Sequence, residues 1–268
     1  MNTKVTLPKD AKRLVVKVGT STLTHGTGKL NLHRIEALVR VLSDLMNSGR
    51  ELVLVSSGAV GAGVGKLGLA ERPSETRKKQ ALAAIGQSSL MSIYDKFFGE
   101  YGHATAQVLL TKDVFEDERR REIAESTFST MFEYGVIPIV NENDVISIEE
   151  IELAFGENDS LAAHVAKLVG ARLLVILSDI DGLYDRNPND PEAKVIPVVD
   201  RITGEVESLA GGAGTTRGTG GMATKIKAAK IVTGAGINMI IANGAHPEKL
   251  YGIFEGEQVG TLFQAVRS

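Results

Sequence analysis

The feature that most constrains the fold of this chain is a set of short apolar runs separated by longer amphipathic stretches. Five runs have the length of β-strands: Arg13–Gly19, Glu51–Gly58, His103–Thr111, Val136–Asp144 and Arg172–Gly182. Most are apolar throughout rather than alternating, which is expected where helices cover both faces of a parallel sheet. The sequence therefore predicts an α/β fold, a three-layer αβα sandwich with a mainly parallel central sheet.

The segments between these runs predict helices and further strands. Helices are expected at Leu30–Gly49, Arg77–Phe98, Glu118–Gly135, Asn158–Ala171 and from Met222 to about Ala235. Lys194–Val199 predicts an edge strand because it contains Pro197. Closing strands are expected at Asn238–Gly244 and Val259–Phe263, and a short hairpin or excursion at Val145–Gly156. No repeat or linker is evident, so we expect a single domain over residues 1–268.

Composition excludes several classes of function. The net charge is −3 without a long basic tract, so nucleic acid is not expected as a partner. There is no cysteine, and the five histidines lack metal-site spacing, so we expect no metal held by protein side chains. No signal peptide and no apolar run of about 18 residues is present, so we expect no membrane span and a cytoplasmic location.

Polar residues follow four of the predicted strands. The strands run into Gly19-Thr20-Ser21, Ser56-Ser57-Gly58, Asn141-Glu142-Asn143-Asp144, and Ser178-Asp179 with Asp181-Gly182. Turn chemistry alone explains any one of these ends. Because ligands of open α/β sheets bind outside the carboxyl ends of the strands, four such ends favour a polar ligand site.

Two lysines are candidates for anion binding. Lys17 lies inside an apolar strand, where an unpaired ammonium group is unfavourable, so it either reaches water from an edge strand or binds an anion at the strand end. Lys225 follows the glycine-rich run "GTTRGTGGMATK", which predicts either a phosphate loop before a helix or a surface loop with a solvated lysine face. These residues alone leave both alternatives open.

Asn158 and Asp159 stand at the beginning of a predicted helix, and either residue is a natural N-cap for it. A capping role explains one of the two side chains but not obviously both.

Taken together, "VVKVGTS", "LVSSGAVGAG", "IPIVNENDV", "FGENDSLAA", "LLVILSDIDGLYDRNP" and "GTGGMATKIKAA" resemble the glutamate 5-kinases (γ-glutamyl kinases) of the amino acid kinase family. The resemblance covers nearly the whole chain in the family's order. It implies a phosphotransferase that uses ATP to phosphorylate the side-chain carboxylate of L-glutamate, giving L-glutamyl 5-phosphate, the first step of proline biosynthesis. It also implies approximate lobes, with residues 1–165 on the amino-acid side and 166–268 on the nucleotide side.

The resemblance also implies a role for individual residues. Lys17 and Lys225 would be the catalytic lysines, and Asp159 would orient them. Ser57, Asp144 and Asn158 would bind glutamate. The ATP contacts would come from Lys17, Ser178, Asp179, Thr219, Gly220, Gly221, Met222, Ala223, Thr224 and Lys225. Mg²⁺ would be bound mainly through the nucleotide, and a carboxylate acceptor would need no general base.

Two features depart from the family pattern. Glu157 stands where the family more often has aspartate in "GDND", and we leave it out of the site. The chain ends soon after "VGTLFQA", so we expect it to lack the C-terminal PUA domain of many members. By resemblance we expect a homo-oligomer, a dimer or tetramer, and feedback inhibition by proline.

Three alternatives compete with this interpretation. The first is a sister kinase acting on N-acetylglutamate, aspartate, carbamate or a nucleoside monophosphate, and "KVGTS" with "NEND" argues against it. The second is a non-catalytic sensor on the same fold. The third is a Rossmann dehydrogenase, suggested only by the glycines of "GAVGAGVGKLG", which follow the second strand without a matching ribose-binding acid.

Overall fold

The computed structural model describes residues 8–146, 158–210 and 221–266. The elements that precede the first gap are β1 (Arg13–Val18), α1 (Thr20–Leu23), α2 (Leu32–Asn47), β2 (Glu51–Ser56), α3 (Ala59–Leu67), α4 (Thr76–Glu100), β3 (Thr105–Leu110), α5 (Asp113–Glu116), α6 (Glu118–Glu133) and β4 (Ile137–Glu142). The later elements are α7 (Asn158–Leu168), β5 (Leu173–Ser178), β6 (Val198–Val199), α8 (Gly204–Ala210), α9 (Met222–Thr233), β7 (Asn238–Asn243), α10 (Lys249–Glu255) and β8 (Thr261–Phe263).

The strands form one eight-stranded sheet in the order β3-β4-β2-β1-β5-β7-β8-β6. All neighbours pair in parallel except β7 and β8, so the predicted mainly parallel sheet is confirmed. β6 lies at one edge, as Pro197 led us to expect. β1 lies near the centre, and Lys17 pairs with Val55 of β2 and Ile176 of β5. The edge-strand explanation of Lys17 is therefore wrong.

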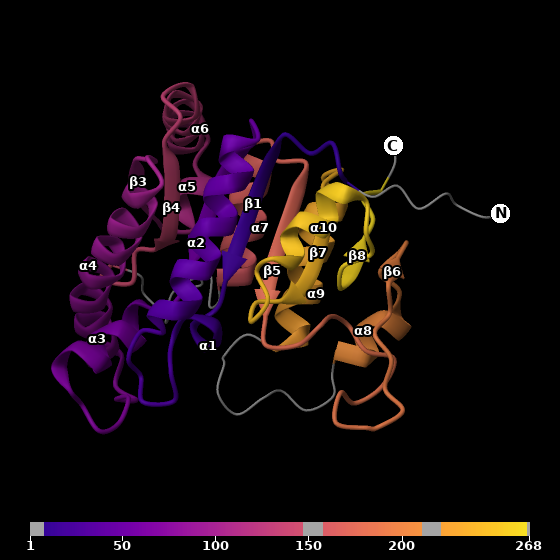
Figure 1. The fold of residues 1–268 in the computed structure, drawn as a ribbon, viewed down its shortest axis with the longest axis horizontal. Coiled ribbons are helices and arrows are strands. Elements are labelled where there is room, and N and C mark those ends of the chain that lie inside the picture. The colour runs from indigo at the N-terminus through magenta and orange to yellow at the C-terminus, as the bar shows by residue number, and fades with distance from the viewer. Residues whose placement is uncertain (1–7, 147–157, 211–220, 267–268) are drawn as a thin grey trace.

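Helices cover both faces of the sheet (Figure 1). One core joins α2, α4 and α10 to the face that carries Leu14 and Val16 of β1. The other joins α6, α7 and α9 to the opposite face, which carries Val15. Because side chains alternate along a strand, Lys17 shares the face of Val15 and lies on the side of α7 and α9.

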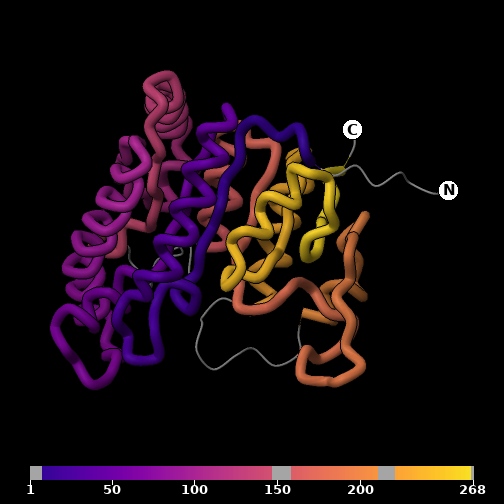
Figure 2. Tube along the Cα trace, viewed as in Figure 1, coloured from indigo at the N-terminus to yellow at the C-terminus, as the bar shows by residue number. Residues whose placement is uncertain are grey.

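The first half of the chain forms one half of the sheet, and the second half of the chain forms the other. In Figure 2 the segment from indigo to magenta forms one side of the molecule, and the segment from orange to yellow forms the other. β1–β4 thus occupy one half of the sheet and β5–β8 the other, with β1 beside β5. No helix among the described residues is long and apolar enough to cross a membrane.

The glycine-rich segment after β2 is a helix rather than a turn. Gly63 of α3 and Gly86 of α4 lie where the two helices cross, because a Cβ atom at Gly63 would stand 2.1 Å from the carbonyl oxygen of Leu82. A Cβ at Gly86 would stand 1.8 Å from the carbonyl oxygen of Ala59. These glycines allow the two helices to pack closely. The glycine motif that suggested a dehydrogenase is therefore part of a helix crossing and gives no support to that alternative.

Other differences from the sequence prediction are local. The short helices α1, α5, α8 and α10 were not predicted, because each is too brief to show a helical period. α7 already includes Asn158 and Asp159, so neither is its N-cap and that expectation is wrong. Most of the predicted hairpin at Val145–Gly156 lies outside the described residues.

The α3–α4 crossing gives a first prediction. We expect Gly86→Ala to lower the free energy of unfolding by about 1–3 kcal/mol, because the new methyl group overlaps backbone atoms of α3. The measurement is urea denaturation followed by circular dichroism. Gly99→Ala is the matched control on the same helix, since nothing lies within 4 Å of its added Cβ. It should raise stability by about 0.5–1 kcal/mol, and an equal effect at both positions would contradict close packing.

Candidate active site

One buried carboxylate binds two lysines from distant parts of the chain. Nζ of Lys17 lies 2.7 Å from Oδ1 of Asp159, and Nζ of Lys225 lies 3.2 Å from Oδ2. The hydroxyl of Thr224 also donates to Oδ2 at 2.9 Å. Asp159 is 0% exposed, and Lys17 and Lys225 are 6% and 5% exposed. The surface-loop explanation of Lys225 is therefore wrong, although Lys227 and Lys230 on the same helix are exposed.

The fold brings these three side chains to the same end of the sheet. Lys17 is the penultimate residue of β1, Asp159 is in the first turn of α7, and Lys225 is in the first turn of α9. α7 and α9 pack side by side on the same core. Both helices therefore present their N-terminal turns near the carboxyl end of β1.

The charges of the lysines outweigh the effect of burial on Asp159. Burial alone would raise the pKa of this carboxyl group, but the charges of Lys17 and Lys225, with hydrogen bonds from Lys17 and Thr224, hold it below its ordinary value. Asp159 is therefore ionised at neutral pH. The cluster of two ammonium groups and one carboxylate carries one positive charge in excess.

Beside this cluster, side-chain amides and a hydroxyl form a wall across β2, β4 and α7. The Nδ2 atom of Asn158 lies 3.0 Å from Oγ of Ser57 and 2.8 Å from Oδ1 of Asn141, and donates to both. Nδ2 of Asn141 donates to Oε1 of Gln87 at 2.9 Å. The structure thus brings Ser57 and Asn158 together, as predicted. Asn141 was predicted only as one of the polar residues after the fourth strand, without a role of its own, and Gln87 was missed by the sequence analysis.

A cavity of about 420 Å³ adjoins the amide wall. Its lining includes Gln87, Glu142, Asn143 and Asp144, together with Gln107 of β3. The two carboxylates and three carboxamides among these residues make it suitable for a small molecule that has both an ammonium and a carboxylate group. Asp144 lines this cavity, whereas Ser57 and Asn158 belong to the wall beside the lysines.

Apart from Lys17 of β1, the described residues predicted to bind ATP lie at the end of β5 and at the start of α9. Ser178 is buried at the end of β5, and its hydroxyl donates to Oδ1 of the exposed Asp179 at 3.1 Å. Gly221 precedes α9 in an extended conformation, and Met222, Ala223 and Thr224 form its first turn with Lys225. The free amide groups of such a turn suit a phosphate group. Thr219 and Gly220 lie outside the described residues.

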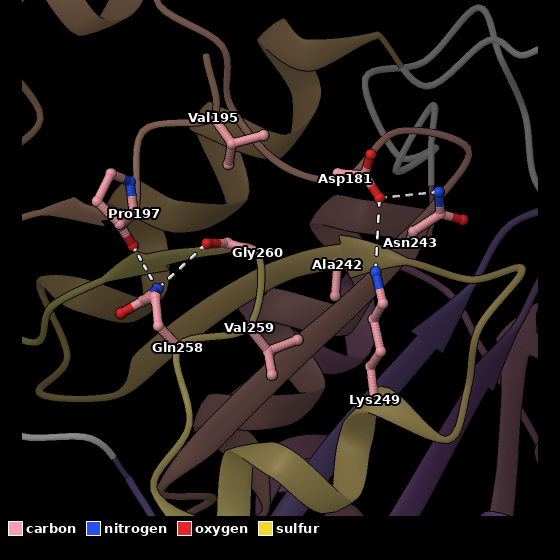
Figure 3. A pocket seen from close by; sticks show the side chains of 9 residues that line it. All are labelled: Asp181, Val195, Pro197, Ala242, Asn243, Lys249, Gln258, Val259 and Gly260. Carbon is pink, nitrogen blue, oxygen red and sulfur yellow. Dashed lines mark hydrogen bonds and ion pairs between the residues drawn. The ribbon is translucent and has the colours of Figure 1, made fainter.

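A second cavity, of about 250 Å³, lies beyond the ends of β5 and β7 (Figure 3). Oδ1 of Asp181 accepts a hydrogen bond from Asn243 at 3.1 Å and lies 3.9 Å from Nζ of Lys249. Asp181 was one of the polar residues predicted to follow the fifth strand. The structure places it in this cavity and not among the contacts of Lys17 and Lys225.

The chain matches known proteins over most of its length. A model of the amino acid kinase family matches residues 12–243. The chain is 59% identical over 260 residues to glutamate 5-kinase of Clostridium perfringens, covering 96% of this chain and 97% of that protein. It is 54% identical to glutamate 5-kinase of Listeria innocua, covering 95% and 94%, and 54% identical to that of Caldanaerobacter subterraneus, covering 96% and 68%.

Solved structures show the same fold at lower identity. Isopentenyl phosphate kinase of T. acidophilum has a TM-score of 0.62 at 18% identity, covering 94% of this chain and 100% of that one. UMP kinase of Bacillus anthracis has a TM-score of 0.63 at 14% identity, covering 96% and 97%. The chain therefore belongs to the amino acid kinase family, and the predicted fold class is confirmed. Within that family, its resemblance to the glutamate 5-kinases is also confirmed.

The buried cluster gives a prediction about pH. Because the pKa of Asp159 is lowered in the folded protein, its contribution to stability is complete above the unfolded value of about 3.9 and is lost as pH falls through the folded value. At pH 7 we expect Asp159→Asn to lower the free energy of unfolding by about 3–5 kcal/mol, since both lysines lose a buried counter-charge. The difference from wild type should shrink below about pH 4.

Urea titrations of both proteins at pH 7 and pH 3.5 measure this difference. Asp113→Asn is the control, because its ion pair with Arg120 lies on the surface and contributes about 0–1 kcal/mol. A difference between wild type and Asp159→Asn that is independent of pH would contradict a stabilising charge on Asp159.

Proposed function

We propose that this chain transfers the γ-phosphoryl group of ATP to the side-chain carboxylate of L-glutamate, giving L-glutamyl 5-phosphate, the first step of proline biosynthesis. The observation that carries the proposal is the contact of Lys17 and Lys225 with one buried carboxylate, Asp159, at the carboxyl end of the sheet. The close similarity to glutamate 5-kinases supports the choice of acceptor.

The lysine cluster suits a phosphoryl group in transfer. Its excess positive charge is buried, so an anion that enters the site interacts with it more strongly than it would in water. Asp159 holds the two ammonium groups in place before the substrates bind. In this proposal it positions Lys17 and Lys225, which contact the phosphates, and does not take up a proton.

The acceptor is assigned to the amide wall and the adjoining cavity. Ser57 and Asn158 lie beside the cluster and would contact the carboxylate that is phosphorylated. The carboxylate of Asp144, on the cavity lining, would meet the α-ammonium group of glutamate. An N-acylated acceptor would lack that positive charge, so Asp144 favours a free amino acid.

The nucleotide is assigned to the end of β5 and the beginning of α9. Ser178 and Asp179 would contact the nucleoside end, and residues 219–225 would surround the phosphates with backbone amides and the side chain of Lys225. Among the described residues, no three acidic or histidine side chains gather as metal ligands. In this proposal Mg²⁺ is carried by the phosphates of ATP, where it would neutralise part of their charge.

The reaction needs no proton transfer by the protein. An oxygen of the glutamate carboxylate attacks the γ-phosphorus, its bond to phosphorus forms, and the bond to the β,γ-bridging oxygen of ATP breaks to release ADP. The nucleophile is already ionised at neutral pH, so positioning and charge neutralisation are sufficient. Lysines and oriented amides supply both.

Several finer assignments are part of the same proposal. The half of the sheet formed by β1–β4 would serve the amino acid and the half formed by β5–β8 the nucleotide, in keeping with the division at residues 165 and 166. Inhibition by proline, assembly into a dimer or tetramer, and a cytoplasmic location follow from the family resemblance.

Replacement of the second lysine tests the catalytic assignment. We expect Lys225→Ala to lower kcat at least ~100-fold, because it removes a charge that stabilises the transition state. Lys227→Ala is the matched control, since Lys227 is exposed on the same helix. Steady-state kinetics with glutamate, ATP and Mg²⁺ measure both variants. An unchanged kcat in Lys225→Ala would remove this residue from the catalytic site.

The identity of the acceptor is tested by trapping the product with hydroxylamine. We expect a hydroxamate with L-glutamate as acceptor, because an acyl phosphate reacts with this nucleophile. ATP turnover is measured in parallel with N-acetylglutamate, aspartate, carbamate and nucleoside monophosphates. Turnover confined to one of these would favour a sister kinase, and nucleotide binding without any turnover would favour a sensor.

A further inference from the structure

Gln87 belongs to the amide wall and to the cavity lining, but neither the family resemblance nor the proposed chemistry gives this buried residue a specific role. It lies on the buried face of α4 and is 7% exposed. Its Oε1 atom accepts a hydrogen bond from Asn141, whereas its Nε2 atom has no partner among the residues that the structure describes. A buried donor without a partner is unfavourable, so a residue needed only for packing would be better served by leucine or methionine.

The hydrogen bonds that start at Gln87 have a fixed direction. Because Oε1 of Gln87 can only accept, Asn141 must turn its Nδ2 toward Gln87 and its Oδ1 toward Asn158. Asn158 must then turn its Nδ2 toward Asn141 and Ser57. Nδ2 of Asn158 also lies 3.3 Å from the backbone carbonyl oxygen of Ser56 and donates to it. The carbonyl of Gln87 and the backbone carbonyl of Ser56 therefore hold the two asparagine carboxamides in this orientation from opposite ends of the series.

The last member of this series is the hydroxyl group of Ser57. Its oxygen accepts from Nδ2 of Asn158, which leaves the single hydroxyl hydrogen to donate elsewhere. A hydroxyl group oriented in this way donates to a carboxylate. If Asn158 were reversed, its Oδ1 would instead accept that hydrogen, and the donor would be lost to the substrate.

α4 also holds Gln87 firmly. Gly86, the preceding residue, lies at the close crossing with α3. One heptad later, Tyr94 lies 2.8 Å from the hydroxyl of Ser56 at the end of β2, and Tyr94 is completely buried. The helix is thus joined to β4 through Gln87 and Asn141 and to β2 through Tyr94 and Ser56, the residue before Ser57.

We propose that Gln87 is a positioning residue for the acceptor substrate, acting through Asn141 to keep Asn158 and Ser57 oriented as donors toward the carboxylate that is phosphorylated. The inference rests on the proposed function, because it assigns the wall beside the lysines to glutamate. Gln87 itself need not touch the substrate. The nucleotide side of the site lies outside the series of hydrogen bonds.

The test compares two substitutions of similar size. Gln87→Met removes the acceptor, so we expect the KM for glutamate to rise about 10-fold while the KM for ATP stays within about 2-fold, in line with the loss of one hydrogen bond. Gln87→Glu keeps an acceptor oxygen toward Asn141. Its KM for glutamate, measured at pH 6.5, should therefore lie much closer to the wild-type value than that of Gln87→Met. Thermal unfolding of each variant is recorded alongside.

A double-mutant cycle with Asn158→Ala separates positioning from packing. The dissociation constant for glutamate is measured by calorimetry with a non-hydrolysable ATP analogue, so that variants with little turnover still give a value. Because Gln87 acts through Asn158, Gln87→Met should weaken binding about 10-fold in the wild-type background and less than about 2-fold in the Asn158→Ala background.

The possible outcomes have distinct meanings. Equal weakening in both backgrounds, or an equal rise in the KM values for glutamate and ATP with a lower melting temperature, would overturn the inference. So would a Gln87→Glu variant that is as impaired as Gln87→Met. If the wild-type chain itself forms no hydroxamate from glutamate, the proposed function fails first. If it does and Gln87→Met behaves as wild type, only the inference about Gln87 fails.

Discussion

The ionised carboxylate of Asp159, held between two ammonium groups, is the interaction on which the site depends. Lys17 belongs to a central strand, and Lys225 belongs to a helix in the other half of the chain. Burial of either ammonium group without a counter-charge would be strongly unfavourable. The group formed by Asp159, Lys17 and Lys225 has one carboxylate and two ammonium groups, so one positive charge is in excess within it. The arrangement is therefore stable enough to form in the folded chain and still attracts an anion. A second carboxylate would have neutralised the site, and none at all would have left two buried cations.

In the proposed function, the surroundings of the cluster would keep the two substrates apart. On one side the wall consists of neutral groups, the amides of Asn158 and Asn141 and the hydroxyl of Ser57, whose orientations are fixed by their mutual hydrogen bonds. On the other side the first turn of α9 offers backbone amides. The side-chain donors of the wall would select the acceptor substrate by their geometry. The free backbone amides at the N-terminus of a helix favour a phosphate group. The lysine cluster lies between them, where the phosphoryl group would pass from one to the other.

The sequence predicted the principal elements well and the local geometry less well. The strands and long helices were predicted correctly because their apolar runs and helical periods extend over enough residues to identify the element, as in β1 and α2. The helix α3 was missed because its glycines indicate a turn, and only the contact with α4 shows why they are there. Lys17, Asp159 and Lys225 were named from motifs, but their meeting depends on the sheet order. Asn141 carried a signal, an amide after an apolar strand, whereas Gln87 resembled any polar residue of a helix.

The position of Gln87 shows why such residues escape motif analysis. Its role depends on the orientation of two other carboxamides. That orientation depends on how closely α4 approaches α3 and β4. Gly63 and Gly86 set the distance between α3 and α4. The two helices lie so close that a Cβ atom at either glycine would overlap the backbone of the other helix. A wider crossing would draw Gln87 away from Asn141 and free the carboxamide of Asn141 to rotate. The glycines that make α3 resemble a nucleotide-binding turn thus act, through helix packing, on the side of the site assigned to the amino acid.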